Sequence, residues 1–282
     1  YLLWVMWNFC SAFLPVRTAL SQLTTTKEYL MPNIKLTLQY DGTRYLGWTR
    51  PAADGYAKTI SYRISSVLQK MTGEDITLFA GAKTAPGVHA LCQTVNFHTE
   101  SPFSDTYFLS KLNEYLPKDI HILSSEIVSD RFRSDLNAVS RTYLYRICTA
   151  PVQNIFTRAY TANIPEIISE SEVAAIRKAA DSLVGVHDFR SLSGVKKKKG
   201  TVKEIFDISV SHSKETENDS FSLLTIKICA NDFLYLMPEH IIEFLIKKGV
   251  DKEVRCNPAG LLLHSITYPD SCSVPSAGSK QV

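Results

Sequence analysis

The chain has 282 residues, of which 45% are hydrophobic and 21% are charged, and its formal net charge is +3. This composition excludes an intrinsically disordered protein, and the length allows one large core or two smaller ones. The mildly basic balance fits a nucleic-acid partner but does not establish one, because a local basic face matters more than the total charge. The six cysteines form no CxxC pair and have no histidine at zinc-ligand spacing, which predicts reduced thiols and no metal site.

Residues 1–16 are almost entirely apolar (YLLWVMWNFCSAFLPV). This run is shorter than the roughly 20 residues that a membrane helix needs. It also lacks the basic segment that precedes the apolar core of a signal peptide. Met31 opens a segment that leads directly into a strand pattern. We therefore expect residues 1–30 to be an extension outside the fold, with a membrane anchor as the alternative.

From residue 33 onward, strand and helix patterns alternate. Alternation of apolar and polar residues predicts strands, and apolar residues at helical spacing predict helices. In chain order we expect a strand over 34–40, a helix over 59–71, strands over 76–80 and 94–98, a helix over 105–116, strands over 120–128 and 142–148, a helix over 171–184, strands over 202–212 and 221–229, a helix over 233–248 and a strand over 261–268.

This order of elements predicts an α+β protein with two similar lobes and flanking helices. We expect the lobes to be residues 31–139 and 140–269, with a cleft between them for a long substrate. Residues 270–282 are rich in Ser, Pro and Gly, which predicts a disordered tail.

Three segments go beyond a generic α+β pattern, namely residues 40–48 (YDGTRYLGW), 83–90 (KTAPGVHA) and 140–146 (SRTYLYR). Three supporting segments are residues 187–190 (HDFR), 233–237 (FLYLM) and 258–263 (PAGLLL). One short motif is weak evidence, whereas six in order and register are specific. Together they resemble the tRNA pseudouridine synthase A family, and the resemblance covers residues 31–269.

The resemblance implies the two-lobed pseudouridine synthase fold with a central antiparallel sheet. It also implies a cytoplasmic homodimer, not attached to a membrane, that binds tRNA and isomerises uridine in the anticodon stem-loop without a cofactor. This chemistry uses a carboxylate nucleophile. The target nucleotide must also leave its stack and be held by an aromatic side chain.

The family's active-site loop reads Gly-Arg-Thr-Asp-Ala-Gly-Val-His-Ala, whereas residues 82–90 read AKTAPGVHA. Ala85 therefore stands at the position of the catalytic aspartate. Alanine offers no nucleophile, no proton acceptor and no charge. Lys83 keeps the positive charge of the family's arginine without its planar fork.

Further departures follow along the chain. Glu239 stands where the family usually has an arginine, and Asp135 stands where it has a basic residue. Pro238 lies inside a predicted helix, where it costs about 3 kcal/mol unless it falls in the first turn. Thr49 and Ser61 replace two glutamines that are usual in the family.

Two other carboxylates come early in the chain, Asp75 before a strand and Asp54 in the loop before the first helix. Neither has a motif around it. A nucleophile misplaced by about 1 Å loses about two orders of magnitude in rate. We therefore expect neither to replace the missing aspartate.

Tyr143 corresponds to the family's tyrosine that packs against the target base. Tyrosines that alternate along a strand are also ordinary core residues, and we assign Tyr145 to the core. The candidate RNA-binding residues are Lys83, Thr84, His89, Arg44, Lys196, Lys197, Lys198 and Lys199.

Several of these RNA-binding candidates have a plainer interpretation. A lysine run such as 196–199 is most often a solvated loop, although lysines also bind phosphates. Arg44 lies in a predicted turn. A lone histidine such as His89 is more often a hydrogen-bonded core residue than a functional one.

Three hypotheses of function remain. The first is a catalytically impaired paralogue that still binds tRNA. The second is an active synthase that uses another group. The third is a decaying gene copy, which the loss of basic residues at Glu239 and Asp135 favours over the first.

Overall fold

The structure is a computed structural model that describes residues 31–50, 55–151, 153–166, 168–196, 200–214, 222–251 and 253–269. The predicted extension over residues 1–30 and the predicted tail over residues 270–282 lie outside the described residues. None of the helices in this part of the chain has the length and apolarity needed to cross a membrane.

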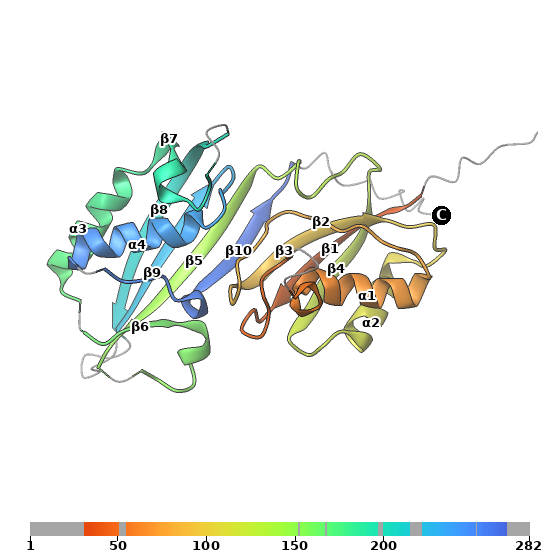
Figure 1. Ribbon diagram of the computed structural model, residues 1–282, viewed down its shortest axis with the longest axis horizontal. Helices are drawn as coiled ribbons and strands as arrows, with labels where there is room; N and C mark the ends of the chain where they lie inside the picture. Colours follow the sequence, from red (N-terminus) through yellow and green to blue (C-terminus); the bar gives the residue numbers. More distant parts are fainter. Residues whose placement is uncertain are drawn as a thin grey trace, which may run out of the picture. The chain divides into compact units, whose positions relative to one another are not determined.

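A sheet of ten strands organises the described residues (Figure 1). In chain order the strands are β1 (Asn33–Tyr40), β2 (Phe79–Ala80), β3 (His89–His98), β4 (Ile120–Val128), β5 (Ser140–Thr149), β6 (Ala162–Ile164), β7 (Gly185–Asp188), β8 (Val202–Lys214), β9 (Ser222–Ala230) and β10 (Leu261–Thr267). Their spatial order is β4-β1-β3-β10-β5-β9-β8-β7, with β2 paired to β3 and β6 paired to β5. The predicted α+β class is confirmed.

The sheet is mixed, although most of it is antiparallel as expected. Among the described strands, the parallel pairs are β10 with β3 and β5 with β6. β10 is the last strand in the sequence, yet it lies between β3 and β5 and pairs with both (Figure 1). The strands on its two sides therefore come from the first and the second half of the chain.

The helices are α1 (Ile60–Thr72), α2 (Asp105–Tyr115), α3 (Glu170–Asp181) and α4 (Met237–Val250). The Thr59 hydroxyl caps the start of α1, and Gly73 ends it with a left-handed φ of 78° that glycine adopts without strain. A capping box of Ser169 and Glu172 starts α3. α2 lies against β4 and α1, while α3 lies against β8 and α4 (Figure 1).

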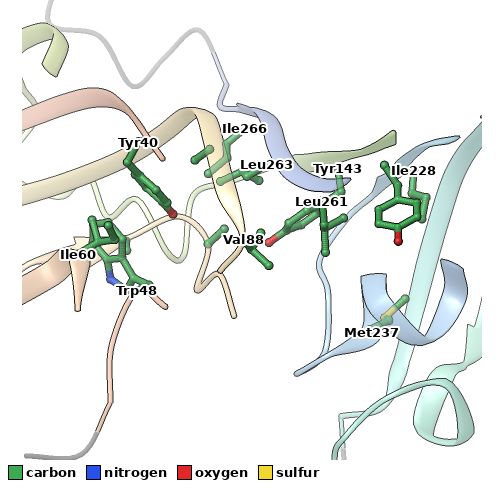
Figure 2. Packing of buried hydrophobic residues seen from close by; sticks show 14 of the residues in the cluster. Tyr40, Trp48, Ile60, Val88, Tyr143, Ile228, Met237, Leu261, Leu263 and Ile266 are labelled. Carbon is green, nitrogen blue, oxygen red and sulfur yellow. The ribbon is translucent and has the colours of Figure 1, made fainter. Parts of the chain in front are cut away.

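The core forms where the apolar face of the sheet meets these helices. Alternation along β1 buries Ile34, Leu36 and Leu38 completely, as the period of the strand requires. Ile60 and Ile64 of α1 are also fully buried. Figure 2 shows part of this cluster, in which residues of β1, β5, β10 and α4 come together. Each large apolar side chain buried in this way stabilises the fold by about 1.5–3 kcal/mol.

Several predicted boundaries differ from the structure. The strand predicted over 76–80 is formed only by β2, and the strand predicted over 94–98 begins earlier, at His89. β7 was not predicted, because four residues are too few to show a strand period. The helix predicted from Phe233 begins at Met237.

Candidate active site

Residues 40–48 and 83–90, the first and second sequence motifs, pack against each other and form the base of the site. The Trp48 amide donates a hydrogen bond of 3.0 Å to the Thr84 carbonyl, and the Gly87 amide donates one of 3.2 Å to the Tyr45 carbonyl. Gly47 has a left-handed φ of 90°, and a Cβ there would lie 2.7 Å from the Thr84 oxygen. The approach of the two loops therefore requires glycine at this position.

Thr84 and His89 are buried and bonded to the first motif. The hydroxyls of Thr84 and Tyr40 are 2.8 Å apart. Nδ1 of His89 accepts a hydrogen bond of 3.2 Å from the Gly42 amide and lies 3.1 Å from a carboxylate oxygen of Asp41. Burial lowers the pKa of His89 below its ordinary value, although the Asp41 charge acts in the opposite direction. Both residues hold the loop that carries residues 83–88.

A pocket of about 310 Å³ opens beside this loop. Its walls come from two parts of the chain that are far apart in the sequence, the loop before β3 and the segment around the start of α4, together with β5. The lining residues are Ala80, Gly81, Ala82, Lys83, Ala85, Val88, Asp135, Arg141, Tyr143, Asp232, Phe233, Leu234, Tyr235, Leu236, Pro238 and Glu239.

Ala85 contributes only a methyl group to this pocket. It is partly buried and packs against the hydrophobic core. Lys83, two residues earlier, is exposed and has no ion-pair partner among the described residues. The position predicted to correspond to the family's aspartate thus lines the pocket, and the Lys83 ammonium beside it can meet a ligand.

Tyr143 lies across the pocket from this loop. Its ring meets Phe233 edge to face, with the centroids 5.0 Å apart, and Figure 2 shows the phenol pointing toward Val88. Burial, followed by the charge of Glu239, raises the pKa of the Tyr143 phenol well above its ordinary value. Tyr145, in contrast, is a core residue whose hydroxyl accepts a hydrogen bond from the Asn257 amide.

The start of α4 forms the opposite wall. Pro238 lies in the first turn of this helix, where the missing amide proton is not needed, so it does not incur the cost considered for a helix interior. Leu236, just before the helix, has a left-handed φ of 57°. Glu239 is half-buried, and desolvation raises the pKa of its carboxyl above the ordinary value.

The other two carboxylates of the pocket are paired. Asp135 accepts two hydrogen bonds from Arg133, at 2.9 and 2.8 Å. Asp232 forms ion pairs with Arg141 and Lys203. Glu239 alone of the three acidic residues that line the pocket forms no ion pair with a described residue.

Arg141 and Asp232 were not among the predicted site residues. The Arg141 guanidinium donates to the carbonyls of Gly81 at 2.6 Å and Asn231 at 2.8 Å, so it joins the two walls of the pocket. The sequence offers one signal for each of these residues. Arg141 lies in residues 140–146, and Asp232 directly precedes the FLYLM segment.

Arg44 does not lie at this pocket. It bonds to Asp119 and lines a second hollow of about 560 Å³, together with His89 and Arg146. Tyr143 and Arg146 are three residues apart on β5, so their side chains point to opposite faces of the sheet. The second hollow is therefore on the other face of β5.

The remaining candidates lie elsewhere. Lys196 is exposed, and Lys197, Lys198 and Lys199 lie outside the described residues, as does Asp54. Asp75 lines a third hollow and not the pocket. No group of three or more His, Cys, Asp or Glu side chains in the described segments is arranged to hold a metal ion.

Comparison with known proteins links this geometry to one family. A family model described as tRNA pseudouridine synthase matches residues 179–269. A tRNA pseudouridine synthase A 2 of Bacillus cereus is 36% identical over 221 residues, which cover 78% of this chain and 85% of that protein. The tRNA pseudouridine synthase A 1 of Clostridium tetani is 35% identical over 250 residues, which cover 84% of this chain and 100% of that protein.

Proposed function

Because the chain belongs to the tRNA pseudouridine synthase A family, we propose that it is a tRNA-binding member whose ability to isomerise uridine is impaired. The observation that carries this proposal is Ala85 in the wall of the pocket. Isomerisation needs a carboxylate that attacks the uridine so that the base can detach, rotate and rejoin through carbon. A methyl group cannot attack, accept a proton or carry charge, so this step lacks its nucleophile.

Several described residues support binding of RNA. Tyr143 and Phe233 give the pocket an aromatic wall against which an extruded base can stack. Lys83 at the pocket and Lys196 at the start of the lysine run offer exposed cations for phosphates. We extend this role to Lys197, Lys198 and Lys199, which continue the run.

The other RNA-binding candidates act indirectly in this proposal. Thr84 and His89 are hydrogen-bonded to residues 40–42 and do not line the pocket, so they hold the loop that presents Lys83 and do not contact RNA themselves. Arg44 is paired with Asp119 on the other face of the sheet and is not part of the pocket. The family resemblance also supports a homodimer and a cytoplasmic location, and sedimentation of the purified protein tests the dimer.

A second candidate function is an active synthase that uses another carboxyl group. Glu239 favours it, because this side chain lines the same pocket as Ala85 and has no ion pair among the described residues. However, the raised pKa of Glu239 favours its protonated form, and a protonated carboxyl is a poor nucleophile. The first candidate therefore has the stronger support.

Tritium release separates the two candidates. The purified protein and its Glu239→Gln variant are incubated with tRNA tritiated at C5 of uridine, and tRNA binding is measured in parallel. We expect salt-sensitive binding and no release from either protein. Release by the unmutated protein that Glu239→Gln abolishes would establish the second candidate. Absence of both release and binding would instead indicate a decaying copy.

A further inference from the structure

A third hollow lies directly beside the pocket. It has a volume of about 310 Å³, and we call it the side hollow. Its lining shares Ala80 and Lys83 with the pocket, so the two cavities meet at these residues. The lining residues are Trp48, Thr49, Tyr56, Ser61, Ser65, Asp75, Ile76, Thr77, Leu78, Ala80 and Lys83.

The short polar side chains of Thr49 and Ser61 line the side hollow. A glutamine at either position would be longer and would project its amide into the same space. The Ser61 amide is bonded to the Trp48 carbonyl at 3.0 Å, so the two positions are held close together by the backbone. The shorter side chains therefore leave room for a ligand.

The chemistry of the lining suits one nucleotide. The Thr49 hydroxyl can donate to and accept from the edge of a base or a ribose 2′-hydroxyl. The Ser65 hydroxyl donates its proton to the Tyr62 carbonyl at 3.3 Å, so it can act as an acceptor toward a ligand. Tyr56 adds an aromatic ring, which offers a surface for stacking. The exposed Asp75 carboxylate accepts hydrogen bonds from amino or hydroxyl groups.

Lys83 connects the two cavities electrostatically. It lines both, is exposed, and has no ion-pair partner among the described residues. Adjacent nucleotides in RNA are joined by a phosphate, and a lysine between two nucleotide-sized cavities can neutralise that phosphate.

We propose that the side hollow binds the nucleotide next to the one held in the pocket, with Lys83 against the phosphate between them. This inference rests on the proposed tRNA binding and deepens it. It predicts that the chain recognises two consecutive nucleotides of a single-stranded or opened segment. The second of them is held through contacts that longer side chains at positions 49 and 61 would exclude.

A double-mutant cycle between protein and RNA tests this inference. Ser61→Gln and Thr49→Gln fill the side hollow, and Thr49 is exposed, so its replacement leaves the core intact. Ser66→Gln is the matched control, because Ser66 lies on the same helix but lines neither cavity. The RNA is an unmodified anticodon stem-loop, intact or with one nucleotide at a time made abasic.

We expect Ser61→Gln and Thr49→Gln to weaken binding of the intact RNA about tenfold, since a stacked base contributes strongly to affinity. On the RNA that lacks the base bound in the side hollow, Ser61→Gln and Thr49→Gln have no further effect. Tyr143→Ala is measured on the same RNAs, and its effect disappears at the neighbouring abasic position. Ser66→Gln has no effect on any RNA.

Three results overturn the inference. An equal effect of Ser61→Gln and Thr49→Gln on every abasic RNA, or no effect on the intact RNA, overturns it while the proposed function stands. Absence of salt-sensitive binding by the unmutated protein overturns the proposed function, and this inference with it. Thermal melts of each variant show that the protein is folded in the binding assay.

Discussion

Ala85 and Glu239 line the same pocket, so a carboxyl introduced at position 85 would share this pocket with the carboxyl of Glu239. Aspartate at position 85 alone would place two carboxyl groups in one partly closed site, where each disfavours ionisation of the other. We predict that Ala85→Asp restores little isomerisation. The double variant with Glu239→Arg restores at least about tenfold more, which corresponds to ~1.4 kcal/mol of barrier.

Tritium release from uridine-labelled tRNA measures this difference. The control is Ala85→Asn with Glu239→Arg, which has the same shape but no carboxylate at position 85. Full activity from Ala85→Asp alone, or equal activity from the asparagine control, would contradict the prediction.

Glu239 also makes stability depend on pH. Burial raises the pKa of its carboxyl, so the folded protein holds this proton more tightly than the unfolded chain does. The stability that the protonated carboxyl contributes is full below the ordinary pKa of glutamate and is lost as the pH rises through the raised value. We predict that Glu239→Gln raises the melting temperature more at pH 8 than at pH 4, by about 2–4 °C for each kcal/mol gained.

The matched control is Glu253→Gln. The hydrogen bond from Lys247 lowers the pKa of the Glu253 carboxyl, so this group stabilises the fold above its ordinary pKa and loses that effect as the pH falls. Its replacement should therefore change the melting temperature with the opposite pH trend. Parallel trends for the two variants would contradict the assignment.

Lys83, Ala85 and Tyr143 could be predicted to share a site because short motifs carry them. Arg141 and Asp232, which also line the pocket, could not be predicted. Arg141 bonds to the carbonyl of Gly81, and Asp232 meets Arg141 across the sheet, through contacts between residues about 60 and 90 positions apart. No local pattern encodes such contacts, since they arise only when the strands pair.

At the scale of elements, the loop before β3 depends on its contact with the first motif. A Cβ on Gly42 would lie 2.0 Å from the Val88 carbonyl oxygen, so this backbone must move if any side chain is added. We predict that Gly42→Ala costs about 1–3 kcal/mol of stability and weakens tRNA binding. Chemical denaturation and a binding titration at a temperature where the variant is folded measure the two effects.

Gly73→Ala is the control for this change. Its φ of 78° makes alanine strained there, but a Cβ would have no neighbour within 4 Å. This variant should lose stability of about 1–2 kcal/mol and keep its tRNA affinity. Equal loss of affinity in both variants would show that the contact with Val88 does not control the site.

Helix ends could be predicted where a local signal marks them. The helix predicted over 59–71 forms α1 (Ile60–Thr72), which lies between the Thr59 cap and Gly73. α4 begins at Met237 and not at Phe233, because Phe233 packs against Tyr143 and the chain turns at Leu236 before the helix starts. Apolar residues in this segment match a helical period although they line a pocket.

For the whole molecule, tRNA binding should depend on salt. Each phosphate that a lysine neutralises releases counterions, so the logarithm of affinity falls with the logarithm of salt concentration. We predict that Lys83→Ala lowers affinity and reduces this slope by about one. Lys178→Ala, on α3 and away from the cavities described above, should leave the slope unchanged. Filter binding over a salt series measures both, and equal slopes for all three proteins would contradict the role of Lys83.

The sheet as a whole could be predicted only in class. Strand and helix patterns indicate an α+β protein, but nothing in residues 261–267 indicates that they pair with both β3 and β5. Strand order depends on contacts between distant segments, and each of those strands has an apolar pattern that several neighbours would satisfy. The family resemblance implied a central antiparallel sheet, whereas the periodicity alone did not predict how the strands are ordered.

The central position of β10 has a consequence for how the protein is made. β10 leaves the ribosome after the other nine strands, so β3 and β5 both present open edges during synthesis. The pocket is lined by β5 and by the loop before β3, and these two strands are joined in the sheet through β10. A nascent chain that stalls before residue 261 would therefore expose two unpaired strand edges. Such edges promote aggregation, so slow completion of translation would favour it.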